Sequence, residues 1–427
     1  MGMVLNTNIP SIQAQRALGE SRKEMEIAME RLSTGSRINS AGDDAAGLAI
    51  VERMNSQIRG LGQATRNAND GIALIKTVEN ALVEVSGMLQ RMRELAVQAS
   101  NDTNTSTERA FADNEVTSLQ KEISRVSLNT RYNGAQVLNG SFAAKSLQVG
   151  TEAGETLDFS IGNVEASKLG AYIVDGLTQS AIAGGSSSDT DYNNGVADAD
   201  VQITSFGTTR TIDVEQYDTA KTIAKKINAV AASTQVVAST AAYAWFYSPT
   251  ANPTVGGVGA VQARLKFVDS TGAATETAAF TLTSNDVSDA IQKINAISSS
   301  TGVHASSTGD YKVLLSEKNG NDITIINTSA RTDLDVKAVG IDGITADSTE
   351  ISLGAASSSS SVDTAVVRGN LKLSSNNDFT INQQTAAEFF SNGEQSAPLV
   401  NVGTISVLTR IKASDSLAII DGAIETV

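Results

Sequence analysis

Cysteine is absent from all 427 residues of the chain, which excludes disulfides and thiolate metal sites. Histidine is nearly absent as well: His304 is the only one, and its Ser/Thr-rich strand context favours a structural role. The zinc-protease motif HExxH does not occur. Paired carboxylates, a nucleophile–base set and a phosphate-binding loop do not stand out either. We therefore predict a protein that is not an enzyme, with no catalytic residue, cofactor or metal.

Proline and aromatic residues are also scarce. No proline lies between Pro10 and Pro249, so the strongest helix breaker is missing from this stretch. Phe111 is the only aromatic residue before residue 131. Helix surfaces built from Ala, Leu, Ile and Met allow close approach of neighbouring helices. This composition fits an assembly of helical rods.

Long apolar runs are missing, and the N-terminus has neither the basic nor the apolar region of a cleavable secretory signal. We therefore expect no membrane insertion. Positive charge is not concentrated in a stripe, so we expect no nucleic-acid partner. Residues 1–145 contain sixteen basic and sixteen acidic residues, whereas residues 146–427 contain sixteen and thirty-one. A neutral segment can pack many copies closely, while an acidic one is better suited to face solvent.

Apolar residues recur in steps of three and four over the first third of the chain, which predicts long helices with a coiled-coil seam. We place these helices at about residues 11–33, 44–100 and 108–129. The second is too long for an ordinary globular helix and indicates a coiled coil or bundle. The predicted helical packing positions are Leu18, Met25, Leu32, Ile50, Met54, Leu61, Ile75, Val78, Leu82, Val85, Leu89 and Met92.

The first two helices are separated by residues 31–51, RLSTGSRINSAGDDAAGLAIV. Gly35 and Gly42 suit helix ends, and Asp43 and Asp44 fall where a new helix starts. The order of residues here strongly resembles the hallmark segment of bacterial flagellin. The segments MVLNTNIPSIQAQRAL, NANDGIALIKTVENAL, QRMRELAVQAS and TRYNGAQVLNG also resemble flagellin. The resemblance covers about the first third of the chain, and it is only loose in the middle.

After residue 133 the apolar period changes to two. Residues 146–150 and 156–162 predict a hairpin, and composition shifts to Ser, Gly, Asp and Thr near residue 177. Residues 198–340 contain an internal repeat of strand, short helix and strand, in which Ile227-Asn228-Ala229 aligns with Ile294-Asn295-Ala296. This repeat resembles the β-α-β insertion unit of flagellins and hook proteins. Two more strands are expected around the turn Asn319-Gly320-Asn321.

A helical pattern returns from Lys412, with Ser414 as a plausible N-cap. The flagellin resemblance implies long C-terminal helices at this point, and we note them as missing from the sequence. We expect an α+β multidomain protein: a long helical coiled-coil or bundle rod with a β-rich variable insertion of repeated β-α-β units. The expected domains are 1–40, an N-terminal filament-core helix and linker; 41–175, a helical rod with a β-hairpin; 176–400, a variable outer region with repeats at about 198–262 and 263–340; and 401–427, the return to the rod.

The resemblance implies a structural subunit that polymerises into the extracellular flagellar filament and serves swimming motility. The alternative is a hook-associated protein or surface adhesin that is exported by the same route. Implied partners are other copies of the chain, the type III flagellar export apparatus and its chaperone, and the hook-associated and cap proteins.

Four groups of residues are candidate sites or need an interpretation. Arg91, Leu95 and Glu115 match residues that an animal Toll-like receptor contacts in flagellins, on a face that also packs between subunits. Asp189, Asp191, Asn193 and Asp200 suggest a calcium loop, but Asn194 stands where glycine is required, which favours a solvated acidic loop. Tyr243, Trp245, Phe246 and Tyr247 predict a local core, or an adhesive patch if they are exposed. Possible O-glycosylation sites, with a flexible surface loop as the alternative, are Ser357, Ser358, Ser359, Ser360 and Ser361.

Overall fold

The computed structural model describes residues 8–101, 103–184, 194–249, 260–269, 272–283, 285–309, 311–330, 333–354, 362–383 and 388–427. The contacts within the chain divide it into two units. Unit one contains the chain up to Glu79 together with Phe142–Ile161, and unit two contains Asn80–Ser141 together with Gly162–Val427. The long helix α2 (Ala45–Ala99) contributes residues to both units.

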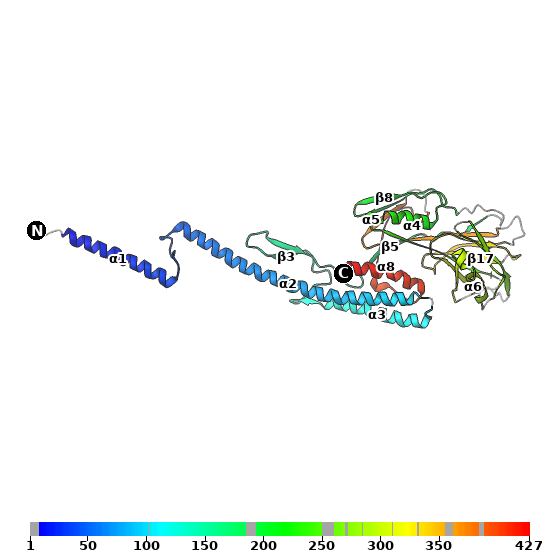
Figure 1. Ribbon diagram of the computed structural model, residues 1–427, viewed down its shortest axis with the longest axis horizontal. Coiled ribbons are helices and arrows are strands. Elements are labelled where there is room, and N and C mark those ends of the chain that lie inside the picture. Colours follow the sequence, from blue (N-terminus) through cyan, green and yellow to red (C-terminus); the bar gives the residue numbers. More distant parts are fainter. Residues whose placement is uncertain are drawn as a thin grey trace. The chain divides into compact units, whose positions relative to one another are not determined.

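The described chain contains three long helices in its first third and shorter ones later (Figure 1). The sequence-based boundaries of the three long helices are confirmed to within two residues. The helices are α1 Ile9–Thr34, α2 Ala45–Ala99, α3 Ser106–Asn129, α4 Ala220–Ala229, α5 Ala231–Thr234, α6 Ser288–Asn295, α7 Ser298–Thr301, the 3₁₀ helix η3 Val402–Thr404 and α8 Arg410–Thr426.

The ends of the long helices follow from local side-chain chemistry. Asn8 caps α1 by accepting a hydrogen bond from the Ser11 N–H, and Gly35 ends it in the left-handed conformation at φ 68°. Thr105 and Glu108 form a reciprocal capping box at the start of α3. These caps satisfy backbone groups that a helix end leaves without partners.

Unit one holds α1, the first part of α2 and a hairpin of two short strands, β3 Lys145–Gln148 and β4 Thr156–Phe159. The predicted hairpin is confirmed, with Leu147 opposite Leu157. The hairpin lies along α2, because the Asn67 side-chain amide donates to the Gln148 carbonyl over 2.9 Å. Phe142 and Phe159 pack at the base of the hairpin with ring centroids 6.0 Å apart.

Unit two holds most of the strands, including the small hairpin formed by β1 and β2. These strands lie in a part of the chain that is rich in β-branched residues and turn formers. The strands outside unit one are β1 Arg131–Tyr132, β2 Ala135–Gln136, β5 Gly170–Asp175, β6 Ile182–Ala183, β7 Val201–Ser205, β8 Thr208–Ile212, β9 Val237–Tyr247, β10 Val261–Ala263, β11 Leu265–Val268, β12 Ala274–Glu276, β13 Phe280–Leu282, β14 His304–Ser307, β15 Val313–Glu317, β16 Ile323–Asn327, β17 Leu334–Val339, β18 Ala346–Leu353, β19 Thr364–Val367, β20 Asn370–Ser375, β21 Phe379–Gln383, β22 Gly393–Ser396 and β23 Leu399–Asn401.

Three sheets organise the β-rich region. The largest has the order β14-β15-β9-β20-β5-β23, with β17 pairing to the second half of β9 and β18 pairing to β17. The second has the order β12-β11-β16-β19-β6, and the third has the order β22-β21-β7-β8. All the pairs between named strands are antiparallel.

Two apolar cores hold these sheets together. In one, Phe246 of β9 meets Phe280 of β13 edge to face, with ring centroids 6.1 Å apart. In the other, Ile223 of α4 packs with Phe379 of β21 and with Phe390. Helix α4 packs against β9 and helix α6 against β14, so each buries its apolar face against a strand, which is the usual way to bury both.

Two strand–helix–strand segments in unit two share a set of hydrogen bonds. Asn228 at the end of α4 exchanges two hydrogen bonds with the Ala238 backbone, at 2.9 and 2.8 Å. Asn295 at the end of α6 exchanges two with Ala305, also at 2.9 and 2.8 Å. The two pairs of hydrogen bonds therefore involve residues that align in the sequence repeat, Asn228 with Asn295. The same side-chain chemistry therefore fixes the strand that follows the helix in both segments.

The two strands expected on either side of Asn319-Gly320-Asn321 are confirmed as β15 and β16, which belong to different sheets. One sequence-based expectation is corrected: the last helix begins at Arg410, where Thr409 caps it, so Ser414 lies inside the helix. The Thr409 hydroxyl accepts from the Lys412 backbone N–H over 3.2 Å, and this local contact sets the start of the helix.

Candidate assembly and recognition surfaces

Helix α1 presents its apolar residues to solvent. None of its described residues is buried, and Leu18 and Leu32 are 64% and 86% exposed. Ile9, Ile12 and Met25 are exposed on the same helix. The helix therefore exposes a row of apolar side chains to water, which makes it a candidate surface for contact with another chain. No helix in the described part of the chain is long and apolar enough to cross a bilayer.

The predicted packing positions of α2 fall into two groups. Towards its start, the apolar seam is exposed, as on α1, at Ile50, Met54, Leu61 and Ile75. Towards its end, the seam is buried within this chain at Val78, Val85, Leu89 and Met92, and Leu82 is half-buried. The first part of α2 thus exposes its apolar residues, whereas the last part buries them in the core of this chain.

The buried end of α2 belongs to a helical group with α3 and α8, which lie beside one another in Figure 1. Arg93 of α2 contacts Asp421 of α8 with its Nε 2.6 Å from the carboxylate. The Gln120 side chain of α3 donates to the carbonyls of Val402 and Ile405 at 2.9 and 3.0 Å. These contacts join residues about 300 positions apart, and no sequence periodicity pointed to them.

The segment between α1 and α2 is held by one carboxylate. Asp43 Oδ2 accepts from the Asn39 and Ser40 backbone N–H groups at 3.2 and 3.1 Å, and Arg31 lies 3.7 Å from its other oxygen. The backbone donors lower the pKa of Asp43, and the Ser40 hydroxyl and Arg31 add to this effect. Asp44 accepts from the Gly47 N–H and so caps α2, as its position in the sequence predicted.

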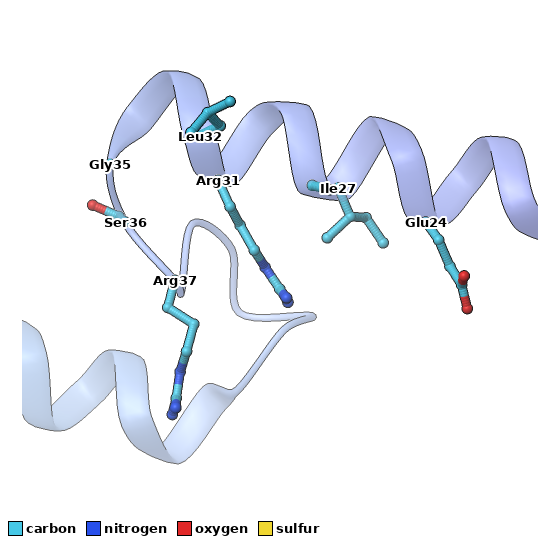
Figure 2. Close-up of a pocket in the computed structure, with 8 residues that line it drawn as sticks. Glu24, Ile27, Arg31, Leu32, Gly35, Ser36 and Arg37 are labelled. Carbon is cyan, nitrogen blue, oxygen red and sulfur yellow. The ribbon is translucent and has the colours of Figure 1, made fainter.

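A concave site of about 660 Å³ lies where α1 meets this segment. Figure 2 shows Glu24, Ile27 and Arg31 pointing to one side of α1, towards the loop that carries Arg37. The site combines apolar and charged groups without a nucleophile or metal-ligand set. It therefore suits packing against another chain segment better than chemistry on a small molecule.

The three residues of the predicted receptor contact lie together, but only two are accessible. Arg91 Nε is 2.8 Å from Glu115 Oε1, and both side chains are nearly half exposed. Glu94 also contacts Arg91, over 2.9 Å. The hydrogen bond from Arg91 to Glu115, then that to Glu94, raises the pKa of Arg91. Leu95 is 3% exposed and belongs to the core beneath the pair.

Of the remaining candidate residues, only some lie in the part of the chain that the structure describes. Ser357–Ser361, Asp189, Asp191 and Asn193 lie outside the described residues. Asp200 lies in a group with Asp198 and Asp213, whose carboxylate oxygens are within 4.8 Å of one another. His304 is exposed in β14.

The aromatic cluster of β9 belongs to the core and its edge. Phe246 is fully buried, and Tyr243 and Tyr247 are 6% exposed. Trp245 is half-buried, with Lys312 Nζ 4.2 Å from its ring centroid. The cluster is thus mainly the local core that the sequence predicted.

Comparisons with known proteins agree with the helical first third. Residues 5–143 match the family model of the bacterial flagellin N-terminal helical region. The chain is 47% identical over 171 residues to B-type flagellin of Pseudomonas aeruginosa, a match that covers 40% of this chain and 35% of that protein. It is 47% identical over 167 residues to flagellin of Halalkalibacterium halodurans, covering 39% and 61%. The solved structure of FliC from Burkholderia pseudomallei is 26% identical over 36% of this chain and 64% of that one, with a TM-score of 0.26.

The similarity to bacterial flagellins therefore lies in residues 5–143, which match their N-terminal helical region. The predicted resemblance is confirmed for this segment. The match spans less than two thirds of the length of either curated relative.

Proposed function

We propose that this chain is a structural subunit that polymerises through its helices into the extracellular bacterial flagellar filament, which serves swimming motility. The observation that carries the proposal is the exposed apolar seam of α1 and early α2, within the segment that matches flagellins. Apolar surface gains about 25 cal/mol per Å² when it is removed from water, so many identical copies can stabilise one another by covering it. The function is mechanical and needs no active site.

The charge distribution supports the proposed domain layout: a filament-core helix at 1–40, a coiled-coil rod at 41–175 with a return at 401–427, and an outer region at 176–400. Residues 1–145 have no net charge, and the chain's net charge of −15 arises after them. Close packing of copies would cost little in the neutral part, because repulsion between like charges is absent. The acidic part would repel its neighbours and is better placed in solvent.

The outer region is proposed to contain two β-α-β insertion units. The matching hydrogen bonds of Asn228 to Ala238 and Asn295 to Ala305 support this proposal. A further pair agrees: the Thr234 and Thr301 hydroxyls donate to Val230 and Ile297 carbonyls at 3.2 and 3.1 Å. If the two segments arose by duplication, each copy would be expected to keep the same hydrogen bonds between residues at the same spacing.

The proposed partners follow from the filament role. They are the type III export apparatus with a chaperone, and the hook-associated and cap proteins at the filament ends. The absence of cysteine supports export as an unfolded thread, because no disulfide can form before folding. A Toll-like receptor of a host is a further proposed partner. Exposed Arg91 and Glu115 support such a contact, whereas buried Leu95 would act by positioning α2.

Electron microscopy of the purified protein tests the filament proposal. We expect Leu32→Asp to abolish assembly into helical filaments, because a charge at this exposed apolar position must be desolvated on assembly. Far-ultraviolet circular dichroism should show the variant to be as helical as the parent in the unassembled state. Normal filaments from Leu32→Asp would show that the α1 seam is not an assembly surface.

A further inference from the structure

The outer face of the third sheet, β22-β21-β7-β8, carries a cavity of about 370 Å³ at the end where β7 turns into β8. Three chain segments far apart in sequence meet there: residues 204–207, 378–380 and 394–397. None of the ten residues that line the cavity is Lys, Arg or His. The cavity is independent of the helical surfaces described above.

Phe206 forms one wall of this cavity and is an unusual residue for its position. It lies in the two-residue turn between Ser205 and Thr208, with φ 51°, and Gly207 follows with φ 69°. Turns of this kind favour Asn-Gly, because both residues need positive φ. The Phe206 side chain is 63% exposed, so core packing does not account for an aromatic ring here either. Tyr217 is likewise exposed at positive φ, so what distinguishes Phe206 is its place in the wall of the cavity.

A row of hydroxyl groups crosses the sheet beside Phe206. The strand register places Thr209, Thr204, Thr380 and Ser396 next to one another on four successive strands. The Thr204 and Thr209 hydroxyl oxygens are 2.9 Å apart, and none of the four residues is buried. This row presents several donors and acceptors in nearly one plane.

Two carboxylates complete the cavity. Glu394 lies two residues before Ser396 on β22, hence on the same face of the sheet, and Asp378 precedes β21; both are exposed.

We propose that this cavity binds a neutral saccharide. The exposed Phe206 ring would stack on the apolar face of a pyranose, and the Glu394 and Asp378 carboxylates would accept hydrogen bonds from sugar hydroxyls. The Thr and Ser hydroxyls can both donate and accept, which matches a polyol. The two carboxylates and the lack of cationic lining residues repel sugars that carry carboxylate or sulfate groups.

Ligand-detected NMR and calorimetry on the whole chain test this proposal. The probes are chitotriose, mannotriose and lactose, with sialyllactose as the anionic counterpart of lactose. We expect saturable binding of at least one neutral probe, and binding of sialyllactose at least about tenfold weaker than that of lactose if lactose binds. No saturable binding of any neutral probe would overturn the proposal, as would equal binding of lactose and sialyllactose.

Two matched substitutions separate recognition from folding. Phe206→Asn removes the ring but suits positive φ, so we expect an unchanged or higher melting temperature and binding weakened about tenfold or more. Tyr217→Asn is the control, because Tyr217 is also exposed at positive φ, 68°, but does not line the cavity. It should leave affinity within about twofold of the parent. Equal affinity of the parent and Phe206→Asn would overturn the assignment of Phe206.

Discussion

Leu18 and Leu89 show how one residue type takes two roles on successive helices. Leu89 of α2 is fully buried, whereas Leu18 of α1 is 64% exposed. Leu89→Ala should lower the free energy of unfolding by about 2–5 kcal/mol, since it removes apolar contacts and leaves a cavity. Leu18→Ala, the matched control, should change it by less than about 0.5 kcal/mol. Denaturant unfolding of the unassembled chain, followed by helical circular dichroism, measures both, and equal losses would contradict the assigned burial.

Asp335 on β17 is a buried carboxylate whose ionisation the fold opposes. It is 2% exposed, and burial, together with the nearby Glu350 carboxylate, raises its pKa from 3.8 to about 6. Glu350 accepts from the Tyr247 hydroxyl over 2.5 Å and from Lys337 Nζ over 3.1 Å. Burial acts to raise the pKa of Glu350, but these donors outweigh it and lower the pKa.

The folded pKa of Asp335 lies above its unfolded value, so the folded state is penalised once the carboxylate ionises. That penalty is absent below pH 3.8, grows as the pH rises to about 6 and is complete above it. Asp335→Asn should therefore raise the unfolding free energy at pH 7.5 by about 1–3 kcal/mol, and the gain should vanish near pH 4. Urea unfolding at both values checks this, with exposed Asp378→Asn as the control. A gain that is equal at both pH values would contradict the assignment.

At the scale of elements, Gly422 decides how closely α8 can approach β5. A Cβ atom at this position would lie 2.8 Å from the Gly170 carbonyl oxygen and 2.9 Å from Ala171 Cβ. Alanine is about 1 kcal/mol better than glycine inside a helix, but overpacking against backbone costs about 1–3 kcal/mol. Since the carbonyl cannot move without shifting β5, we expect Gly422→Ala to lower the melting temperature.

Gly87 of α2 is the matched control for that substitution. It is exposed inside a helix, and a Cβ atom there would meet nothing within 4 Å. Gly87→Ala should therefore raise stability by up to about 1 kcal/mol, through helix propensity alone. Thermal unfolding of the two variants should shift in opposite directions. Shifts in the same direction would show that α8 does not sit against β5 as described.

Helices α1 and α3 should differ in hydrogen exchange. No described residue of α1 is buried, while α3 buries Val116, Ile123 and Val126. Isolated helices gain most of their stability from packing, so the α1 amides should exchange far faster than those of α3 in the unassembled chain. Mass spectrometry of residues 11–33 in a proven monomer measures this. Strong protection there would mean that the α1 seam is already covered.

At the scale of the whole molecule, the outer β region should be dispensable for polymerisation. The proposed assembly seam lies outside residues 178–397, and most of the acidic excess follows residue 145. Deleting 178–397 with a short linker keeps β5 and β23, which pair through Tyr172 and Leu399. We expect thinner filaments by electron microscopy. A folded, exported deletion variant that does not assemble would show that the outer region takes part in polymerisation.

The sequence alone determined the helical part of this protein. Three long helices, the helix end at Gly35 and the flagellin resemblance all follow from local periodicity, caps and residue order, which depend on neighbours within a few turns. The apolar seam was also visible, although its division into an exposed part and a part buried from Val78 onward was not. Burial depends on which other elements lie against each turn.

The tertiary structure decided what distant segments do together. Only it placed β15 and β16 in different sheets, joined Arg93 to Asp421, and buried Leu95 beneath an exposed ion pair. It also brought Phe206 beside Asp378 and Glu394 in one cavity. Sheet pairing and cavity formation arise from contacts across hundreds of residues. Their energies depend on side-chain packing between strands, which a local pattern does not encode.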